Sequence, residues 1–228
     1  MPAIRPCAIY GCTAMTTPRS FSPLCKRHRR RRDRAGHPEQ LQLTLAALRP
    51  YILLIEDTHE RNLDSPLWSH LLARYQALVG LAREHSVGTY PGRSRTPPRA
   101  ADIILKVSQP RSGAQVADPA EVIRHQLAAH LMRYQRPGLF RNDAAFRYAL
   151  VKRWRYFAPA SKGSKYSHRT GKVSGWYQDL PPKVRALAGD WLVSAFGLPG
   201  AMVAEQITRQ QQAEVQKRQD DREVRLGR

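Results

Sequence analysis

The sequence predicts a mainly α-helical protein, in which a small N-terminal unit precedes a helical hairpin, a helical basic domain and a polar tail. Apolar residues recur every three to four positions through several long segments, which is the spacing of one helix face. Few segments alternate between polar and apolar residues as strands do, and no period of about 20 to 50 residues repeats. The expected units are residues 1–38, 39–90, 91–200 and 201–228, the last being either helical or disordered.

The N-terminal unit contains all three cysteines of the chain, close to a histidine. An odd number of clustered thiols beside a histidine favours metal ligation over disulfide bonding. The two ligand pairs have the spacings C-x4-C and C-x2-H and comprise Cys7, Cys12, Cys25 and His28. Three thiolates and one imidazole complete a tetrahedron around Zn²⁺ and leave no position for water, so we expect one structural zinc ion. His37 is an alternative fourth ligand.

The segments CAIYGC, PLCKRH and RRDRAGHP resemble the small Cys3His treble-clef-type zinc fingers of bacterial and phage proteins, some of which accompany HNH endonuclease domains. The resemblance covers residues 5–38 and includes Arg31, Gly36 and Pro38 besides the four ligands. Arg29 and Arg32 stand where that family usually has aromatic residues. The resemblance implies a structural zinc ion and association with nucleic acid, in a phage or mobile-element setting, without implying a particular reaction.

A strongly basic helix is expected to start beside the last ligand. Its cations nearly encircle the helix and are Lys26, Arg27, Arg29, Arg30, Arg31, Arg32 and Arg34. Such a density of like charge suits the neutralisation of phosphates with release of counterions, which gives affinity without sequence choice. We therefore predict that these residues contact nucleic acid.

The next segment, residues 39–90, is expected to form a hairpin of two helices. Leucines and isoleucines recur at helical spacing from Leu41 onwards, and Pro50 is expected to kink or divide the first helix. Ser65 is the expected N-cap of the second helix, which opens with Pro66. The hairpin offers a surface, over residues 41–79, through which a protein partner could bind.

Beyond the hairpin, residues 85–98 are rich in glycine, serine, proline and arginine, which indicates a linker between domains. Asp118 is expected to cap a helix over residues 119–135, and another helix is expected to begin near Asn142 and to cover residues 142–157. The arrangement of the two permits a helix-turn-helix-like use of the second one. Residues 158–175 indicate a loop. A last patterned helix, over residues 184–196, is expected to stop at Gly197 and Pro199.

Charge indicates the class of partner. The 38 lysines and arginines against 18 acids give a formal charge of +20, which would repel itself in a compact fold unless a polyanion offsets it. Residues 1–38 and 118–183 carry most of it, with +8 and +9, whereas residues 39–90 carry −2. Nucleic acid is the expected partner, with DNA favoured over RNA.

The second basic block interleaves cations with aromatic residues. Cations can follow the phosphates of a strand while exposed rings stack on its bases. The predicted contacts in this block are Lys152, Arg155, Lys165, Tyr166, Arg169, Lys172 and Trp176. Trp154 instead fits the apolar stripe of its helix, so we expect it in the core.

Other classes of protein agree less well with the sequence. Residues 41–55, taken as the most apolar stretch, are too short to span a bilayer, and the N-terminus lacks a secretory signal pattern, so we expect no membrane association and a cytoplasmic location. Gly171 and Lys172 lack the spacing of a P-loop. His125 and His130 are not part of an HExxH motif, and we expect them on a helix surface.

No catalytic residues can be assigned from the sequence. It contains neither paired histidines with an adjacent asparagine nor a compact carboxylate cluster for Mg²⁺. A DNA-binding regulator or accessory factor is therefore expected rather than an enzyme. Two alternatives stay open, namely a protein-interaction adaptor and a nuclease with an unrecognised catalytic site.

Overall fold

A computed structural model describes residues 4–17, 21–88, 94–109, 116–158, 164–168, 170–175 and 179–225. Within these residues the chain is mainly α-helical, as predicted, with one short antiparallel sheet. The elements are α1 (Lys26–Ala35), α2 (Leu45–Glu60), α3 (Pro66–Val87), α4 (Thr96–Ser108), α5 (Pro119–Gln135), the 3-10 turn η2 (Pro137–Leu139), α6 (Asp143–Arg155), β1 (Ser164–Ser167), β2 (Lys172–Gly175) and α7 (Pro182–Arg225).

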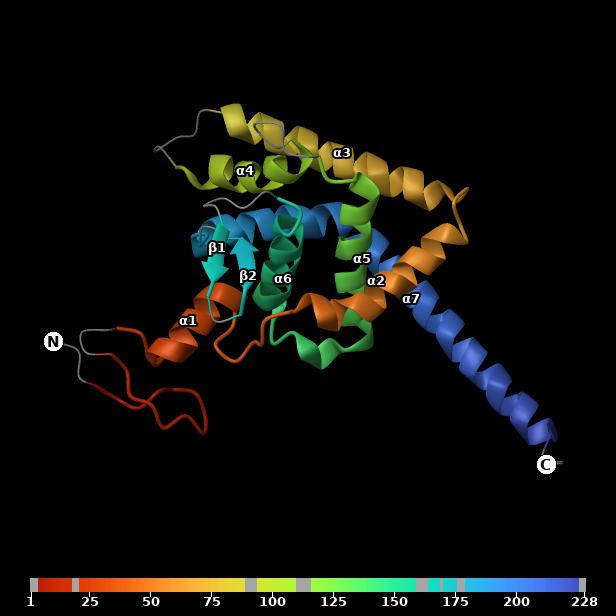
Figure 1. Cartoon of the computed structure of the whole chain (residues 1–228), viewed down its shortest axis with the longest axis horizontal. Helices are drawn as coiled ribbons and strands as arrows, with labels where there is room; N and C mark the ends of the chain where they lie inside the picture. The colour runs from red at the N-terminus through yellow and green to blue at the C-terminus, as the bar shows by residue number, and fades with distance from the viewer. Residues whose placement is uncertain are drawn as a thin grey trace.

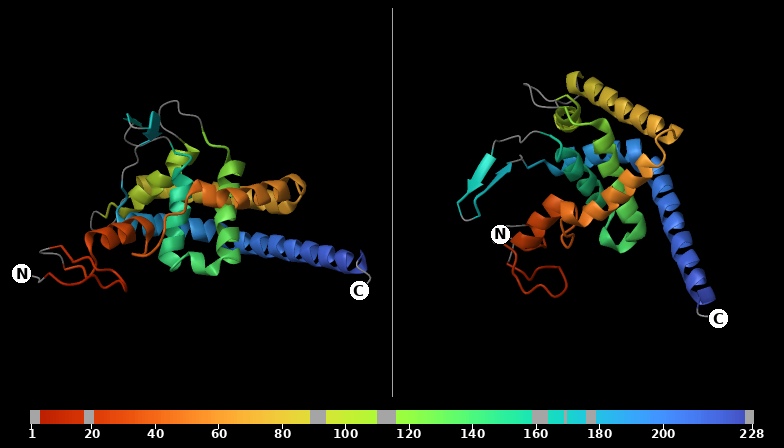
Figure 2. Two further views of the ribbon diagram at one scale, coloured as in Figure 1. Left: turned by 60° about the horizontal axis from the view of Figure 1, so that its bottom comes forward. Right: turned by 45° about the vertical axis from the view of Figure 1, so that its right-hand side comes forward.

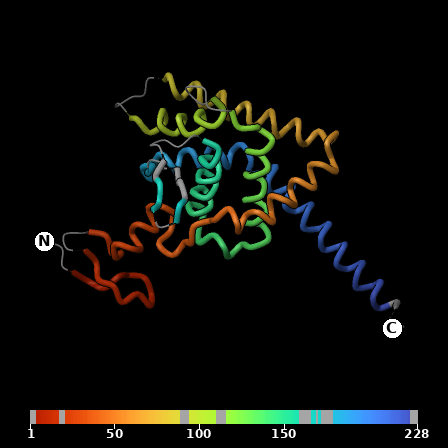
Figure 3. Tube along the Cα trace, viewed as in Figure 1, coloured from red at the N-terminus to blue at the C-terminus, as the bar shows by residue number. Residues whose placement is uncertain are grey.

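The helices surround α6, which packs against α1, α4, α5 and α7 (Figure 1). Helices α3 and α4 lie side by side, and α7 passes behind the others before its last turns extend beyond them. The β-hairpin stands off the helices in both views of Figure 2. The N-terminal segment and the end of α7 lie at opposite ends of the molecule, as the trace in Figure 3 shows.

One buried apolar cluster includes side chains from every helix between α2 and α7. Trp154, Phe146 and Phe196 are its largest fully buried members. The indole Nε1 of Trp154 donates a hydrogen bond to the carbonyl oxygen of Ile104 at 3.4 Å, so its one polar atom is satisfied. The prediction that Trp154 belongs to the core is confirmed, and the expected hairpin shares this core with the segments that follow it.

The predicted helix caps at Ser65 and Asp118 are present, and Asn142, near which a helix is expected to begin, also acts as a cap. The side chains of Ser65, Asp118 and Asn142 each accept a hydrogen bond from a backbone N–H in the first turn of the next helix, at 3.4, 3.0 and 2.8 Å. The first helix of the hairpin differs from the prediction, because it begins at Leu45, after the cap residue Thr44, and runs through Pro50 without dividing. Leu41 therefore lies in the extended segment between α1 and α2.

The linker expected over residues 85–98 is shorter than predicted. Helix α3 continues to Val87, and α4 begins at Thr96, so the apolar run at residues 103–107 is helical. Pro97 and Pro98 lie in the first turn of α4, where a missing N–H costs little because those groups have no partner within the helix. A pair of prolines marks a helix start here rather than a loop.

Helix α7 does not stop at Gly197 and Pro199, which corrects the predicted end. Proline lacks the N–H that would bond to the carbonyl of Ala195, four residues earlier. Arg74 of α3 supplies donors instead, since its Nε lies 2.6 Å from the Ala195 carbonyl oxygen and its Nη2 lies 2.8 Å from that of Ser194. A tertiary contact therefore satisfies the carbonyl, and the helix continues as far as Arg225.

Part of the expected loop at residues 158–175 is a β-hairpin. Its register pairs Ser164 with Gly175 and Ser167 with Lys172. Gly171 turns the chain with a φ of 62°, and its N–H donates to the Ser167 carbonyl oxygen at 2.8 Å. Strands of four residues are too short for alternation to reveal them in the sequence.

Helix α7 contains a longer apolar segment than residues 41–55. Over Pro182–Glu223 it is long and apolar enough to cross a membrane by length and composition alone, with a mean hydropathy of 1.3 in its most apolar window. In this structure 44% of that window is buried, against helices that include α5 and α6. The core helix of a soluble protein meets the same criterion, so the segment is weak evidence for a membrane span.

His125 and His130 are buried in α5, contrary to the expected surface positions. The His130 ring packs edge-on to Phe146, with ring centroids 4.9 Å apart. Nδ1 of His125 and Nε2 of His130 have no hydrogen-bond partner among the described residues. Burial, reinforced by nearby arginines, lowers the pKa of each ring to about 4, so both stay neutral near pH 7.

Candidate metal centre and nucleic-acid groove

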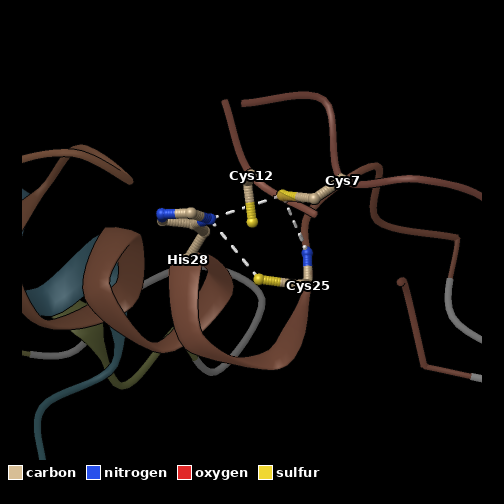
Figure 4. A group of neighbouring side chains, drawn as sticks. All are labelled: Cys7, Cys12, Cys25 and His28. Atoms are coloured by element: carbon tan, nitrogen blue, oxygen red, sulfur yellow. Dashed lines mark hydrogen bonds between the residues drawn. The ribbon is translucent and has the colours of Figure 1, made fainter. Parts of the chain in front are cut away.

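Cys7, Cys12, Cys25 and His28 converge at the start of α1 (Figure 4). One ligand atom from each lies within 4.8 Å of all the others. Cys25 is the N-cap residue of α1, and His28 lies in its first turn. The four predicted ligands could therefore hold one metal ion. His37 is not among them, and its Nδ1 instead accepts a hydrogen bond from the N–H of Glu39 at 3.2 Å.

Backbone hydrogen bonds shape the loop that contains the first two ligands. The N–H groups of Cys7 and Cys12 donate to the carbonyl oxygens of Ala14 and Ile9, each at 3.0 Å. Gly11 has a φ of 73°, which a residue with a side chain rarely adopts. This turn brings the Cys12 thiol back towards Cys7.

The donor set suits a metal that prefers soft ligands. Nδ1 of His28 lies 3.4 Å from the sulfur atoms of both Cys7 and Cys25. Burial would raise the pKa of the Cys7 thiol, but hydrogen bonds that include the N–H of Cys25, 3.3 Å from the sulfur, lower it to about 6. Thiolate and imidazole ligands in a four-coordinate cluster fit Zn²⁺, and four protein ligands make the site structural.

Around this centre there is very little apolar core. Its buried cluster contains only Cys7, Leu24 and Cys25 among the described residues, with Ile9 and Cys12 packed against it. Two of the three members are themselves candidate ligands. A bound metal would therefore contribute most of the folding free energy of this segment.

The far end of α1 is seated firmly on the helical body. Gly36 ends the helix with a φ of 81°, and a Cβ there would lie 2.7 Å from the backbone of Ala144 and Ala145. Nη1 of Arg185, from α7, donates to the Asp33 carbonyl oxygen at 2.5 Å. Because these contacts fix α1, the metal centre and the body are joined through one short helix.

A groove runs between α1 and the extended segment that precedes α2. We call it the outer groove, and its cavity volume is about 600 Å³. The side chains that line it are Lys26, Arg27, Arg30, Arg31, Arg34, Gln40, Leu41 and Gln42. Five of these eight are cations and none is acidic, so the cavity is strongly electropositive.

A second cavity, of about 630 Å³, lies between α1, α6 and the start of α7, and we call it the inner pocket. Arg34 and Gln42 line both cavities, so the cavities adjoin at these two side chains. The remaining cations of the inner pocket are Lys152, Arg153, Arg155 and Arg185, and its other lining residues are Tyr148, Val151, Tyr156, Asp179 and Leu180. The two basic blocks of the sequence thus line two adjoining cavities, which together we call the groove.

Two guanidinium groups of the inner pocket are buried over tyrosine rings. Arg153 is 6% exposed, with its Cζ 4.6 Å from the centre of the Tyr156 ring. Arg185 is 8% exposed, with its Cζ 4.7 Å from the centre of the Tyr148 ring. Burial lowers the pKa of both arginines, which means that each charge is poorly solvated. A bound anion would relieve that cost.

Lys152 extends from α6 to the opposite wall of the groove. Its Nζ lies 3.1 Å from Oε1 of Gln42 and 3.2 Å from the carbonyl oxygen of Leu43, which are neutral acceptors. Burial, followed by the neighbouring Arg153 charge, lowers the pKa of this amine. The prediction that Lys152 and Arg155 belong to one basic surface agrees with the geometry.

The other predicted nucleic-acid contacts are not all lining residues of the groove. Arg29 and Arg32 do not line the groove, and Arg32 pairs with Asp33 at 3.0 Å. Lys165, Tyr166 and Lys172 belong to the β-hairpin, where Tyr166 is 51% exposed. Arg169 and Trp176 lie outside the described residues.

Four cationic or aromatic lining residues are not among the predicted contacts, although three of them lie within the second basic block. Arg153, Arg185, Tyr148 and Tyr156 are part of the inner pocket. A signal was available for two of them, because Tyr148, Lys152, Arg155 and Tyr156 follow helical spacing and so share one face of α6. The opposite face carries the core residues Phe146 and Leu150.

Helix α6 is poorly placed to act as a recognition helix. Seven of its thirteen residues are buried, and it is enclosed by α1, α4, α5 and α7. A recognition helix must present a free face to enter a major groove. The helix-turn-helix interpretation is therefore not supported, and α6 instead forms one wall of the inner pocket.

Comparisons of the chain with protein families, curated proteins and solved structures found no match. The candidate metal centre and the groove therefore stand on the residues and geometry described above.

Proposed function

We propose that this protein is a zinc-stabilised nucleic-acid-binding protein, with DNA as its favoured partner. The observation that carries the proposal is this pair of adjoining cavities, which nine cations line: five in the outer groove and four more in the inner pocket. Asp179 is the one acid among the lining residues, and it lies 3.7 Å from Arg34. Such a groove suits a polyanion whose charges follow one another along a strand.

In this proposal the metal acts on the groove through α1. Zinc held by Cys25 and His28 would anchor the start of the helix, while Gly36 and Arg185 anchor its end. The groove-facing cations of α1 would then keep a fixed distance from those of α6. The finer assignment, a regulator or accessory factor of a phage or mobile element, rests on the resemblance of residues 5–38 alone.

A protein-interaction adaptor is a second candidate, and one observation favours it. The hairpin exposes several leucines, namely Leu45, Leu53, Leu63 and Leu72. Salt separates the two functions, because phosphate binding weakens steeply as salt rises whereas an apolar interface does not.

The test is a set of salt titrations of the binding of an unrelated-sequence DNA. Replacing Arg27, Arg30 and Arg31 by Ala should weaken binding and flatten the plot of log K against log salt concentration by roughly two to three units of slope. The matched control replaces Lys217, Arg218 and Arg222, three exposed cations at the end of α7, and should leave the slope unchanged. Equal losses in the two triple variants would show attraction to total charge rather than to the groove.

A further inference from the structure

The inner pocket combines features that a nonspecific phosphate surface does not need. Tyr156 is 49% exposed at the C-terminal end of α6, and its ring lines the cavity. The Arg153 guanidinium lies over that ring, and the His125 ring stacks near it at 5.8 Å between centroids. These contacts hold the tyrosine in one orientation. An exposed, preordered ring beside cations is the arrangement that stacks on nucleobases.

The position of the ring distinguishes between forms of nucleic acid. In a continuous duplex the bases are stacked inside, and extruding one costs a few kcal/mol. A duplex could place phosphates against the cations at the rim, such as Arg34, but could not offer a base face to Tyr156 within the pocket. A single strand can do both, because its bases are free to turn towards the wall.

We propose that the inner pocket accepts one unpaired nucleotide, so that the protein prefers single-stranded nucleic acid to continuous duplex. The base stacks on Tyr156, and the adjacent phosphates lie near Lys152 and Arg34, which lead into the outer groove. The volume of about 630 Å³ is of the size of pockets that enclose small-molecule ligands. This inference rests on the proposed nucleic-acid function and specifies the form of its ligand.

The experiment compares three labelled oligonucleotides of about 12 nucleotides, a length within the range of single-strand binding sites. They are a mixed-sequence single strand, the same strand annealed to its complement, and a single strand with abasic sites that keeps every phosphate. Full-length protein should bind the normal strand at least about tenfold more tightly than either of the others at one salt concentration. The comparison with the abasic strand needs no variant, so it does not depend on the folding of a mutant.

Three tyrosine variants test the assigned ring. Tyr156→Ala should bind the normal strand about tenfold more weakly, which corresponds to about 1.4 kcal/mol, and should leave the other two oligonucleotides unaffected. Tyr156→Phe keeps the ring and should bind like the unaltered protein. Tyr134→Ala, at a ring of similar exposure (48%) on α5, is the matched control and should have no effect.

The outcomes distinguish the single-strand preference from the proposed nucleic-acid-binding function on which it rests. Equal affinity for duplex and single strand, or an equal loss on all three oligonucleotides in Tyr156→Ala, overturns the single-strand preference while nucleic-acid binding stands. If no oligonucleotide binds in a salt-dependent way, the proposed function fails as well.

Discussion

The metal-centre segment and the helical body are built on different physical principles. The segment around Cys7 and Cys25 buries three residues in its own cluster, whereas the body buries an extended cluster drawn from α2 to α7. A small segment cannot gain enough from apolar burial to offset the conformational entropy that it loses. The proposed zinc ion would therefore stabilise one part of the groove, whereas hydrophobic packing stabilises the other.

The largest expected effect is the loss of the metal centre. His28→Gln should reduce bound zinc from one ion per chain to nearly none, because structural zinc contributes about 10 to 16 kcal/mol in small fingers. Hydrogen exchange should then show loss of protection in residues 4–35 and little change in α3 to α7. His37→Gln is the matched control, since His37 lies outside the ligand cluster, and it should retain zinc. Zinc retained in His28→Gln but lost in His37→Gln would refute the ligand assignment.

A substitution in the core should destabilise the helical body without loss of the bound metal. Trp154→Ala should lower the free energy of unfolding by about 3 to 5 kcal/mol, because it opens a cavity in the core, while the variant still binds one zinc ion. Urea denaturation followed by circular dichroism measures the loss. Trp191→Ala should lower the free energy of unfolding by less, because this tryptophan is only partly buried and stacks on His85. A lower zinc content in Trp154→Ala would mean that the metal centre and the helical body are not stabilised independently of each other.

Acid should weaken the body through its buried histidines. The His130 pKa is lowered to about 4 by burial and by Arg133, from an ordinary 6.5. Below pH 6.5 the unfolded chain binds a proton that the folded chain excludes, so the free energy of unfolding falls between pH 6.5 and 4, by about 3 kcal/mol for this group. Above pH 6.5 this group does not contribute to the pH dependence of the free energy of unfolding.

His130→Leu should make the free energy of unfolding less dependent on pH, and it should not raise the metal affinity. The measurement is denaturation of both proteins at a series of pH values. Both proteins have the same metal centre, so the release of zinc in acid affects them equally. The unfolding free energy of His130→Leu minus that of the unaltered protein should increase by about 3 kcal/mol as the pH falls from 6.5 to 4. A difference that is constant with pH would mean that His130 titrates normally in the folded protein.

The smallest effect concerns the groove that joins the regions. Asp179→Asn removes its one acidic lining residue and should tighten nucleic-acid binding by roughly twofold, because the charge is exposed and well screened. Asp190→Asn, at a carboxylate paired with Arg147 at 2.9 Å and outside the groove lining, should change the affinity less. Fluorescence anisotropy at low salt would detect the difference, and equal tightening would indicate a general charge effect.

Signals in the sequence predicted the fold class, the cluster of Cys7, Cys12, Cys25 and His28, and the caps at Ser65 and Asp118. The caps and the helix faces depend on residues a few positions apart, and the two ligand pairs lie within the short segment 7–28. The continuation of α7 was not predictable, since it depends on Arg74 reaching the Ala195 carbonyl from 121 positions away. Similarly, the side chain of Lys152 contacts Gln42 from 110 positions away, so the sequence indicated two basic blocks without indicating that they share a groove.

Hydroxyl-radical footprinting with a short oligonucleotide is the most direct test of whether α1 and α6 form one binding surface. Leu41 of the outer groove is paired with Leu198 of α7, both 70% exposed, and Tyr156 of the inner pocket is paired with Tyr134. We predict that Leu41 and Tyr156 become protected together, at one oligonucleotide concentration, while Leu198 and Tyr134 stay reactive. Protection of only one groove residue, or of all four alike, would contradict the account.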